Sequence, residues 1–269
     1  MRVTPRAWIG IAVWAAYTVL VFVLGLVSGI AYTDLGDSAE TLFRGPVMFL
    51  AAGALLAVVI TSVLGWWRPA LRDERRSRHA WPIVAPAIMA LAVVITLSLG
   101  TDWTRIDGAY LVGLVLLAVL VGFNEEIVTR GLLLTGLRAN VREPLAWFLS
   151  SALFALMHAT NALNGAPLLG TLQQMGFAFL GGTAFYIVRR VTGSLIWAMV
   201  LHGAWDFSTF ASGHAPGAVG IGPFIGIVGE VLALVFVFWT FRSAGADEPA
   251  DPVGRAATAE ADATNRSSQ

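Results

Sequence analysis

Long apolar stretches, separated by short polar links, run along most of the chain. Most of them are about 20 residues long, which is the length that an α-helix needs to cross the hydrocarbon core of a bilayer. The predicted spans are residues 8–30, 46–66, 82–99, 109–138, 144–160, 168–188, 195–211 and 220–241. This pattern predicts an all-α fold, a polytopic membrane helical bundle of about eight transmembrane helices.

The basic residues of the links gather on one side of the predicted membrane. All 17 lysine or arginine positions of the whole chain are arginine, and the positive-inside rule places arginine-rich links in the cytoplasm. The links on this side hold Arg2, Arg6, the cluster from Arg68 to Arg78, the stretch from Arg130 to Arg142, Arg189, Arg190 and Arg242. The other links hold mostly acidic residues, asparagine and glycine, with two single arginines as exceptions. The distribution predicts that both termini are cytoplasmic, and no repeat suggests the inverted halves of a transporter.

The composition favours a membrane protein over a soluble one. Of the 269 residues, 57% are hydrophobic and only 13% are charged, whereas a soluble domain has about 25% charged residues. The net charge of zero indicates no nucleic-acid partner. The chain has no cysteine, which excludes disulfides, a cysteine nucleophile and thiolate metal sites.

The predicted spans divide the chain into four segments. Residues 1–108 hold three N-terminal transmembrane helices, and residues 109–211 form a core that carries most of the ionisable residues found within spans. Residues 212–242 hold the last transmembrane helix. Residues 243–269 are rich in Ala, Asp, Glu and Ser and have almost no large apolar residue, which predicts a disordered cytoplasmic tail.

Three predicted helices of the core carry ionisable residues at membrane depth. Each such residue costs about 2.5 to 3.5 kcal/mol on insertion scales, so its default interpretation is functional. They are Glu125, Glu126 and Arg130 on the first helix, His158 on the second, and His202 and Asp206 on the third. Counted from the arginine-rich ends of their helices at about 1.5 Å per residue, the positions of Glu125, Glu126, His158, His202 and Asp206 are compatible with the middle of the bilayer.

The spacing within each helix suggests which side chains meet. Glu126 and Arg130 are four residues apart with the acid first, which favours a helical ion pair. Glu125 points about 100° away around the same helix and stays available for chemistry. His202 and Asp206 are also four residues apart, so the carboxylate can orient the imidazole ring or share its work.

A glutamate and two histidines from separate helices can activate a water molecule, either around a metal ion or directly. Each feature alone also has a structural interpretation. His158 can be a hydrogen-bond partner between helices, Phe154 can be core packing one turn before it, and both i,i+4 pairs can be purely structural. Glu230 lies halfway along the last span without an obvious partner. It can be a protonated, hydrogen-bonded structural group or it can line the same cavity, and the structural interpretation is favoured.

The order of these residues resembles the three motifs of the CPBP intramembrane proteases. This is the CAAX-protease and bacteriocin-processing family, also called Abi. The motifs are Glu125-Glu126-x-x-x-Arg130-Gly131, Phe154-x-x-x-His158 and His202-x-x-x-Asp206, and the stretch from Tyr186 to Leu195 is similar as well. The resemblance covers roughly residues 112–207, and it implies endoproteolysis inside the membrane.

The resemblance also implies roles for the motif residues. By analogy, Glu125 is the base that activates the attacking water, and His158 assists it or binds the same water or metal. His202 and Asp206 stabilise the oxyanion or complete a metal site. The remaining members of the motifs, Glu126 with Arg130, are expected to hold the first motif in shape, and Phe154 to support the second.

Asp206 departs from the pattern, because many members of the family have asparagine there. Asparagine can donate a hydrogen bond to an oxyanion, whereas an ionised aspartate cannot. The aspartate therefore favours a metal ligand or a residue that orients His202. Glu125, His158 and His202 are the predicted ligands if the site holds Zn²⁺ or another divalent metal ion, since two histidines and a carboxylate suit zinc and leave a position for water. A water activated by Glu125 and His158 needs no metal.

The expected function is hydrolysis of a peptide bond in a membrane-associated protein or peptide. The expected enzyme is a CAAX-protease-like intramembrane (metallo)endopeptidase, a multi-pass protein of a bacterial plasma membrane. A prenylated substrate is not implied, because bacterial members of the family vary in substrate. Two alternatives remain: a catalytically silent scaffold or immunity protein of the same fold, and a proton-coupled transporter that uses Glu125, Glu126 and Glu230 as a relay.

Overall fold

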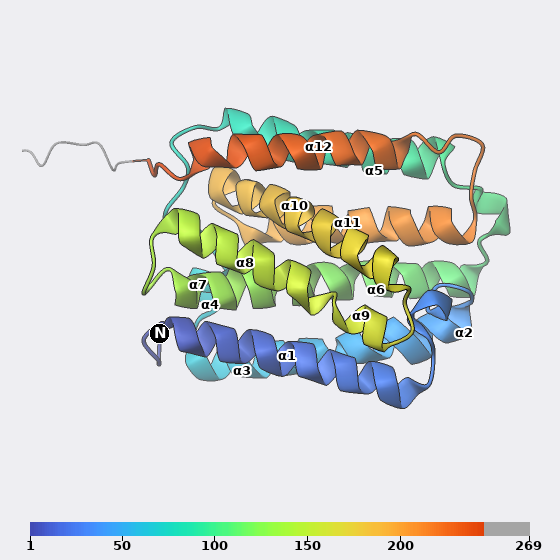
Figure 1. The fold of residues 1–269 in the computed structure, drawn as a ribbon, viewed down its shortest axis with the longest axis horizontal. Coiled ribbons are helices and arrows are strands. Elements are labelled where there is room, and N and C mark those ends of the chain that lie inside the picture. The colour runs from blue at the N-terminus through green and yellow to red at the C-terminus, as the bar shows by residue number, and fades with distance from the viewer. Residues whose placement is uncertain (245–269) are drawn as a thin grey trace, which may run out of the picture.

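The computed structural model describes residues 1–244, which are helical along most of their length (Figure 1). The α-helices are α1 (Ala7–Ser28), α2 (Ala39–Leu42), α3 (Met48–Leu64), α4 (Trp67–Leu71), α5 (Val84–Leu99), α6 (Gly108–Glu126), α7 (Leu134–Leu137), α8 (Glu143–Met157), α9 (Thr160–Leu163), α10 (Leu168–Thr192), α11 (Leu195–His214) and α12 (Gly222–Phe236). Short 3₁₀ segments occupy Tyr32–Asp34, Trp81–Ile83, Trp103–Arg105 and Val237–Thr240, and π-helical segments occupy Phe43–Val47 and Ile127–Leu133. These residues form no β-strand, so the predicted all-α fold is confirmed. The predicted tail lies outside the described residues, apart from Ser243 and Ala244.

Six helical segments of the described chain are long and apolar enough to cross a membrane. They are Ala7–Ser28, Ala39–Leu64, Trp81–Leu99, Gly108–Leu137, Glu143–Leu163 and Gly222–Thr240. The polytopic membrane bundle is therefore confirmed. Helices α10 and α11 are long but fall outside this set, because α10 carries glutamines and arginines and α11 carries the His202 motif. The number of eight spans and the orientation of the termini stay predictions.

The helices run along one common axis and pack in layers (Figure 1). Helices α5 and α12 pair on one side of the bundle, and α1 and α3 pair on the opposite side. Helices α6, α8, α10 and α11 lie between these two pairs. Helix α11, which carries the His202 motif, thus packs against the more apolar helices α5 and α6, which lowers the cost of its polar side chains at membrane depth.

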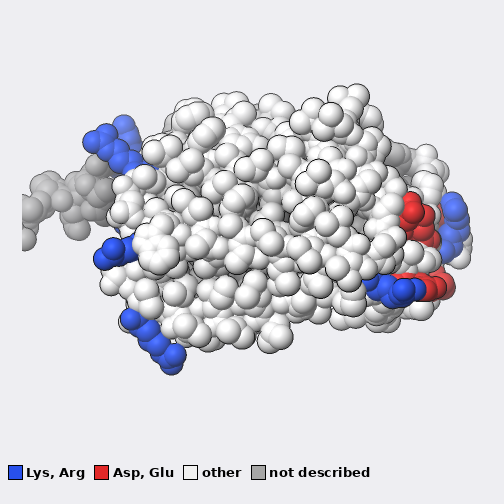
Figure 2. Space-filling model, turned by 60° about the horizontal axis from the view of Figure 1, so that its bottom comes forward, with Lys and Arg blue, Asp and Glu red and all other residues white. Residues whose placement is uncertain are grey.

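Charged side chains on the outer surface gather at the two ends of the bundle. Figure 2 shows a broad band without Lys, Arg, Asp or Glu between a blue end and an end with both colours. Large apolar side chains such as Leu55, Leu91 and Phe224 are well exposed along the helices. An exposed apolar band between charged rims is what a bilayer requires of a protein that spans it.

Helix α10 ends at Thr192 and not at residue 188, so Arg189 and Arg190 lie in the helix. Gly193 ends it with a φ of 73°, and the N–H of Gly193 bonds to the carbonyl of Arg189, a common helix stop. Both arginine side chains are fully buried. The sequence analysis placed them in a link after the predicted span, and this placement was wrong, because both lie within α10.

Asp73, in the link after α4, forms ion pairs with these buried arginines. Its carboxylate lies 2.9 Å from Arg138 Nη2, 3.3 Å from Arg189 Nε and 3.8 Å from Arg190 Nη1. Burial alone would raise the pKa of Asp73, but the three guanidinium groups hold it at about 2. Glu143, at the start of α8, also pairs with Arg138 and Arg190. The network ties this end of the bundle together.

Helices α6 and α11 cross at a contact that only glycine permits. A Cβ atom at Gly122 would collide with the carbonyl of Met199 and lie 3.2 Å from the nitrogen of Gly203. A Cβ atom at Gly203 would collide with the carbonyl of Ala118. Because the two backbones touch here, the acidic pair that follows Gly122 lies directly beside the histidine that precedes Gly203.

Candidate active site

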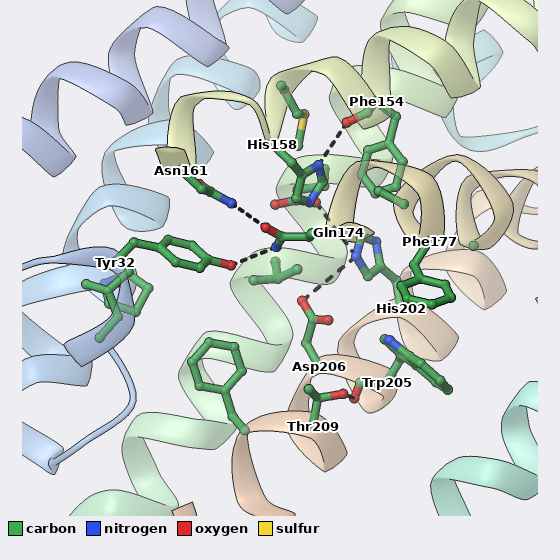
Figure 3. Close-up of a pocket in the computed structure, with 18 of the residues that line it drawn as sticks. Tyr32, Phe154, His158, Asn161, Gln174, Phe177, His202, Trp205, Asp206 and Thr209 are labelled. Carbon is green, nitrogen blue, oxygen red and sulfur yellow. Dashed lines mark hydrogen bonds and ion pairs between the residues drawn. The ribbon is translucent and has the colours of Figure 1, made fainter. Parts of the chain in front are cut away.

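The three predicted motifs line one cavity of about 630 Å³ inside the bundle (Figure 3). Glu125 reaches it from the end of α6, Phe154 and His158 from the end of α8, and His202 and Asp206 from the middle of α11. Packing of these three helices therefore brings together residues that lie up to about 80 positions apart in the chain. The convergence that the sequence predicted is present.

Glu126 and Arg130 form the predicted ion pair. Oε1 of Glu126 lies 2.9 Å from Nη1 of Arg130, and both side chains are fully buried. The guanidinium group also donates to the Thr129 hydroxyl and lies 3.9 Å from the centre of the Phe154 ring. Gly182 of α10 leaves room for it, since a Cβ atom there would collide with the guanidinium group.

The backbone around this pair is π-helical from Ile127 to Leu133. Such segments are rare and occur frequently at functional sites. The wider turn starts directly after Glu126, and the Thr129 hydroxyl bonds to the carbonyl of Glu125 within it. The sequence analysis expected a regular helix here, so the π segment was not predicted.

His202 lies among three carboxylates. Its Nδ1 is 3.0 Å from Oε1 of Glu126, which is hydrogen-bonding distance. Its Nε2 is 3.7 Å from Oε2 of Glu125 and 3.9 Å from Oδ2 of Asp206. An N–H donated from Nδ1 to Glu126 leaves Nε2 directed at the cavity. Glu126 therefore contacts both Arg130 and His202, a link between two motifs that the spacing did not predict.

His158 is fixed by the end of its own helix. Its Nδ1 lies 2.9 Å from the carbonyl oxygen of Phe154, so a Nδ1–H donates there and leaves Nε2 free on the cavity side. The Phe154 ring packs edge-on against both histidines, with centroids 5.2 Å from His158 and 5.6 Å from His202. Phe154 thus contacts both imidazoles, and the guanidinium group of Arg130 lies over its ring.

Several residues around the site carried no sequence signal. Phe185 of α10 stacks on His202 with ring centroids 4.5 Å apart. Tyr17 of α1 lines the cavity, and its buried hydroxyl has no hydrogen-bond partner among residues 1–244. Asn124 donates to the carbonyls of Leu50 and Leu120, which ties α6 to α3 next to the acidic pair. The two aromatic residues are indistinguishable in the sequence from ordinary apolar core.

A chain of amide and hydroxyl groups lines the cavity (Figure 3). Asn161 donates to the side-chain oxygen of Gln174, and the amide of Gln174 donates to the hydroxyl of Tyr32. The backbone N–H of Tyr32 in turn bonds to the carbonyl of Asn164. These contacts join the link after α1 to α9 and α10.

Glu230 of α12 lines the same cavity. Its side chain is almost fully buried, and its Oε2 has no hydrogen-bond partner among the described residues. The carboxyl group lies beside α10, since a Cβ atom at Gly181 would be 3.4 Å from Oε1. Of the two interpretations of Glu230 in the sequence, the favoured one was a structural group. The position in the cavity fits the other, a group that lines the site.

The predicted metal ligands are chemically suitable but not grouped for a metal. Glu125, His158 and His202 offer a carboxylate and two ring nitrogens, and each histidine bonds through its other nitrogen as metal-binding histidines do. Within residues 1–244, however, no three His, Asp or Glu side chains are arranged to hold a metal ion. Zinc therefore stays a prediction, and no step below depends on it.

Comparison with known families agrees with the motifs. Residues 107–208 match the family model described as Rce1-like, type II CAAX prenyl endopeptidase. No curated protein matches the chain. The matched residues run from just before α6 into α11 and contain all three motifs, whereas Glu230 lies beyond them. The resemblance predicted from the motifs is confirmed over residues 107–208.

Proposed function

We propose that this chain, whose residues 107–208 belong to the Rce1-like family of type II CAAX prenyl endopeptidases, is an intramembrane endopeptidase. Its substrate is a membrane-associated protein or peptide, and its membrane is the plasma membrane. The observation that carries the proposal is the position of Glu125 beside His202, with Oε2 and Nε2 3.7 Å apart, in a cavity that also holds His158.

Glu125 is the proposed base. It lies close enough to Nε2 of His202 for both groups to hold one water molecule, and His158 presents its Nε2 to the same cavity. Glu125 takes a proton from this water, and the water oxygen attacks the carbonyl carbon of the peptide bond. When the C–N bond breaks, the proton passes from Glu125 to the departing amine, and the products are a carboxylate and an amine.

His202 is the proposed stabiliser of the oxyanion. In its protonated form the ring donates from Nδ1 to Glu126 and from Nε2 toward the cavity, where negative charge develops on the carbonyl oxygen. The neighbouring carboxylates stabilise that form, because hydrogen bonds between opposite charges are about twice as strong as neutral ones. Packing against Phe185 on one side and Phe154 on the other fixes the plane of the ring.

Glu126, Arg130 and Phe154 are proposed as positioning residues. None of them needs to touch the substrate, since Arg130 holds Glu126, and Glu126 holds Nδ1 of His202. Asp206 was predicted to orient His202 or to bind a metal. Since Glu126 orients the ring, we assign Asp206 to the cavity side, where its carboxylate faces Nε2 at 3.9 Å.

A zinc ion, if bound, would be held by Glu125, His158 and His202, and it would supply Lewis acidity to the water and the carbonyl oxygen. The residues described above perform their binding, orienting and proton-transfer roles in either case.

The proposal is tested with purified protein in lipid nanodiscs and a library of apolar peptides, with products read by mass spectrometry. Cleavage by the wild type that is lost in Glu125→Gln, His158→Ala and His202→Ala, each folded and inserted, supports it. Peptides that bind but stay intact with the wild type would favour the catalytically silent scaffold. Proton-coupled uptake that survives His158→Ala would favour the transporter.

A further inference from the structure

Tyr17 of α1 is a buried tyrosine whose hydroxyl group has no partner. The residue is only 3% exposed, it lines the cavity of the candidate site, and its hydroxyl oxygen makes no hydrogen bond within residues 1–244. A buried hydroxyl without a hydrogen bond destabilises the folded state, and a phenylalanine at this position would avoid that cost. A hydrogen bond to a molecule bound in the cavity would remove the cost as well.

The packing of α1 against α6 places Tyr17 level with the acidic pair. The two helices run in opposite directions, and α6 continues through the π segment into α7 (Figure 1). A Cβ atom at Gly10 would lie 3.0 Å from the Cα atom of Leu133, so the backbones touch there. About two helical turns separate Gly10 from Tyr17, and about two turns separate Leu133 from Glu126. Tyr17 therefore lies at the depth of Glu125 and Glu126.

The ring of Tyr17 also lies beside the residue that precedes Glu125. A Cβ atom at Gly53 of α3 would be 2.7 Å from Cε2 of Tyr17 and 3.3 Å from Oδ1 of Asn124. This amide oxygen is buried too and has no hydrogen-bond partner among the described residues. A water molecule between the hydroxyl and the amide oxygen is the structural alternative, because it would satisfy both groups without any part in catalysis.

Helix α8 places Tyr17 near the second motif as well. Helices α1 and α8 run in the same direction, and the indole N–H of Trp14 donates to the carbonyl oxygen of Leu153 at 3.0 Å (Figure 1). Tyr17 lies about one turn beyond Trp14, and His158 lies between one and two turns beyond Leu153. Tyr17 therefore reaches the cavity at about the level where Glu125 and His158 reach it.

The motif residues that face the cavity supply one hydrogen-bond donor for an oxyanion. Protonated His202 donates from Nε2. Neutral His158 donates its Nδ1–H to the carbonyl of Phe154, so its Nε2 can only accept, and an ionised Asp206 can only accept too. Enzymes that stabilise a tetrahedral intermediate use preorganised donors, and a tyrosine hydroxyl is one of the groups that serve. The unpaired hydroxyl of Tyr17 is such a donor, held at the right depth by a fourth helix.

We propose that Tyr17 is a catalytic residue, whose hydroxyl donates a hydrogen bond to the carbonyl oxygen of the scissile peptide bond together with His202. The inference rests on the proposed function, and it adds a residue from α1, which lies outside the matched residues 107–208. The hydroxyl keeps its proton throughout. Its hydrogen bond strengthens as negative charge develops on the carbonyl oxygen, since bonds to charged acceptors are stronger than neutral ones.

Tyr17→Phe removes the hydroxyl group and keeps the ring. Cleavage of one peptide and thermal unfolding are both measured with purified protein in lipid nanodiscs. We expect kcat to fall about 10²–10³-fold, as for the loss of one oxyanion donor, with little change in KM. We expect the unfolding temperature to stay the same or to rise, because the hydroxyl has no partner in the free protein.

Tyr110→Phe is the matched control. Tyr110 is as well buried as Tyr17, but its hydroxyl donates to the carbonyl oxygen of Gly36 at 2.7 Å. Its loss leaves a carbonyl without this bond, so we expect the opposite pattern, a lower unfolding temperature and unchanged cleavage.

An unchanged kcat in Tyr17→Phe, or a change in KM alone, would overturn the inference. A lower unfolding temperature would overturn it too, because it would show that the hydroxyl is paired in the free protein, as in the water bridge to Asn124. Glu125→Gln separates this failure from a failure of the proposed function. If the wild type cuts no peptide faster than Glu125→Gln, the proposed function fails and the inference fails with it. If only Glu125→Gln loses cleavage, the inference fails alone.

Discussion

Nδ1 of His202 lies 3.0 Å from Oε1 of Glu126, and this contact separates the tasks of two adjacent glutamates. Glu126 is turned into the protein, where it joins His202 to Arg130. Glu125, one residue earlier, faces the cavity and approaches the other nitrogen of the same ring. The acidic pair therefore supplies one carboxylate for orientation and one for chemistry.

The buried pair of Glu126 and Arg130 has an exposed counterpart in Glu40 and Arg44. Both pairs have i,i+4 spacing and a distance of 2.9 Å, but the side chains of the second pair are about 70% exposed. Breaking a buried pair costs about 3–5 kcal/mol, because the remaining charge loses its compensation, and Glu126 would keep only the contact with His202. An exposed pair contributes about 0–1 kcal/mol. We expect Arg130→Leu to lower the thermal unfolding temperature in detergent strongly and Arg44→Leu to change it little. Equal shifts would contradict this account.

Asp206→Asn tests the carboxylate that faces Nε2 of His202. The amide keeps the size of the side chain and can donate a hydrogen bond to an oxyanion. We expect cleavage within about tenfold of the wild-type rate, because a single hydrogen bond contributes about 0.5–1.5 kcal/mol. Cleavage kinetics on one peptide measure this, with Asp206→Ala as the comparison that loses both interactions. A complete loss in Asp206→Asn would show that the negative charge itself is required.

Asp73 makes the stability of the folded protein depend on pH. Its pKa of about 2 in the folded protein is below the ordinary value of 3.8, so the unfolded chain binds the proton more readily. The stabilisation is therefore fully present above about pH 4 and is lost as the pH falls toward 2, by about 2 kcal/mol. Unfolding in detergent between pH 5 and pH 2 measures it. The Asp73→Asn variant should start less stable and lose less over this range, and an identical slope would contradict the assignment.

Metal dependence is decided by metal analysis of the purified protein together with activity after chelation. Because Glu125 and His202 are close enough to hold a water molecule between them without a metal ion, we expect the chelated protein to keep its activity. Loss of activity that zinc restores, with about one zinc per chain and none in His158→Ala, would instead assign Glu125, His158 and His202 as ligands.

The course of the main helices could be predicted because span length and apolar composition are local properties. The burial of Arg189 and Arg190 could not, because the acid that neutralises them lies more than 100 residues earlier in the chain. The turn into a π-helix after Glu126 could not be predicted either. Nothing in the apolar sequence around it marks where the backbone widens.

In the candidate site too, contacts within one helix could be predicted from the sequence, and contacts between helices could not. The pairing of Glu126 with Arg130 follows from helical spacing, so the sequence predicted it. The contact between Glu126 and His202 joins residues 76 positions apart, and it depends on the glycine contact between α6 and α11. Phe185 gave no signal, because an aromatic residue in an apolar helix is usually core packing.

The central claim is that Glu125 activates water for proteolysis inside the membrane. The most direct test compares the new N-termini of membrane and exported proteins in cells that express equal amounts of the wild type, Glu125→Gln or the exposed control Glu40→Gln. The account predicts a set of new N-termini with the wild type and with Glu40→Gln that disappears with Glu125→Gln, since loss of a general base costs about 10²–10⁴ in rate. The same set of N-termini with Glu125→Gln would contradict it.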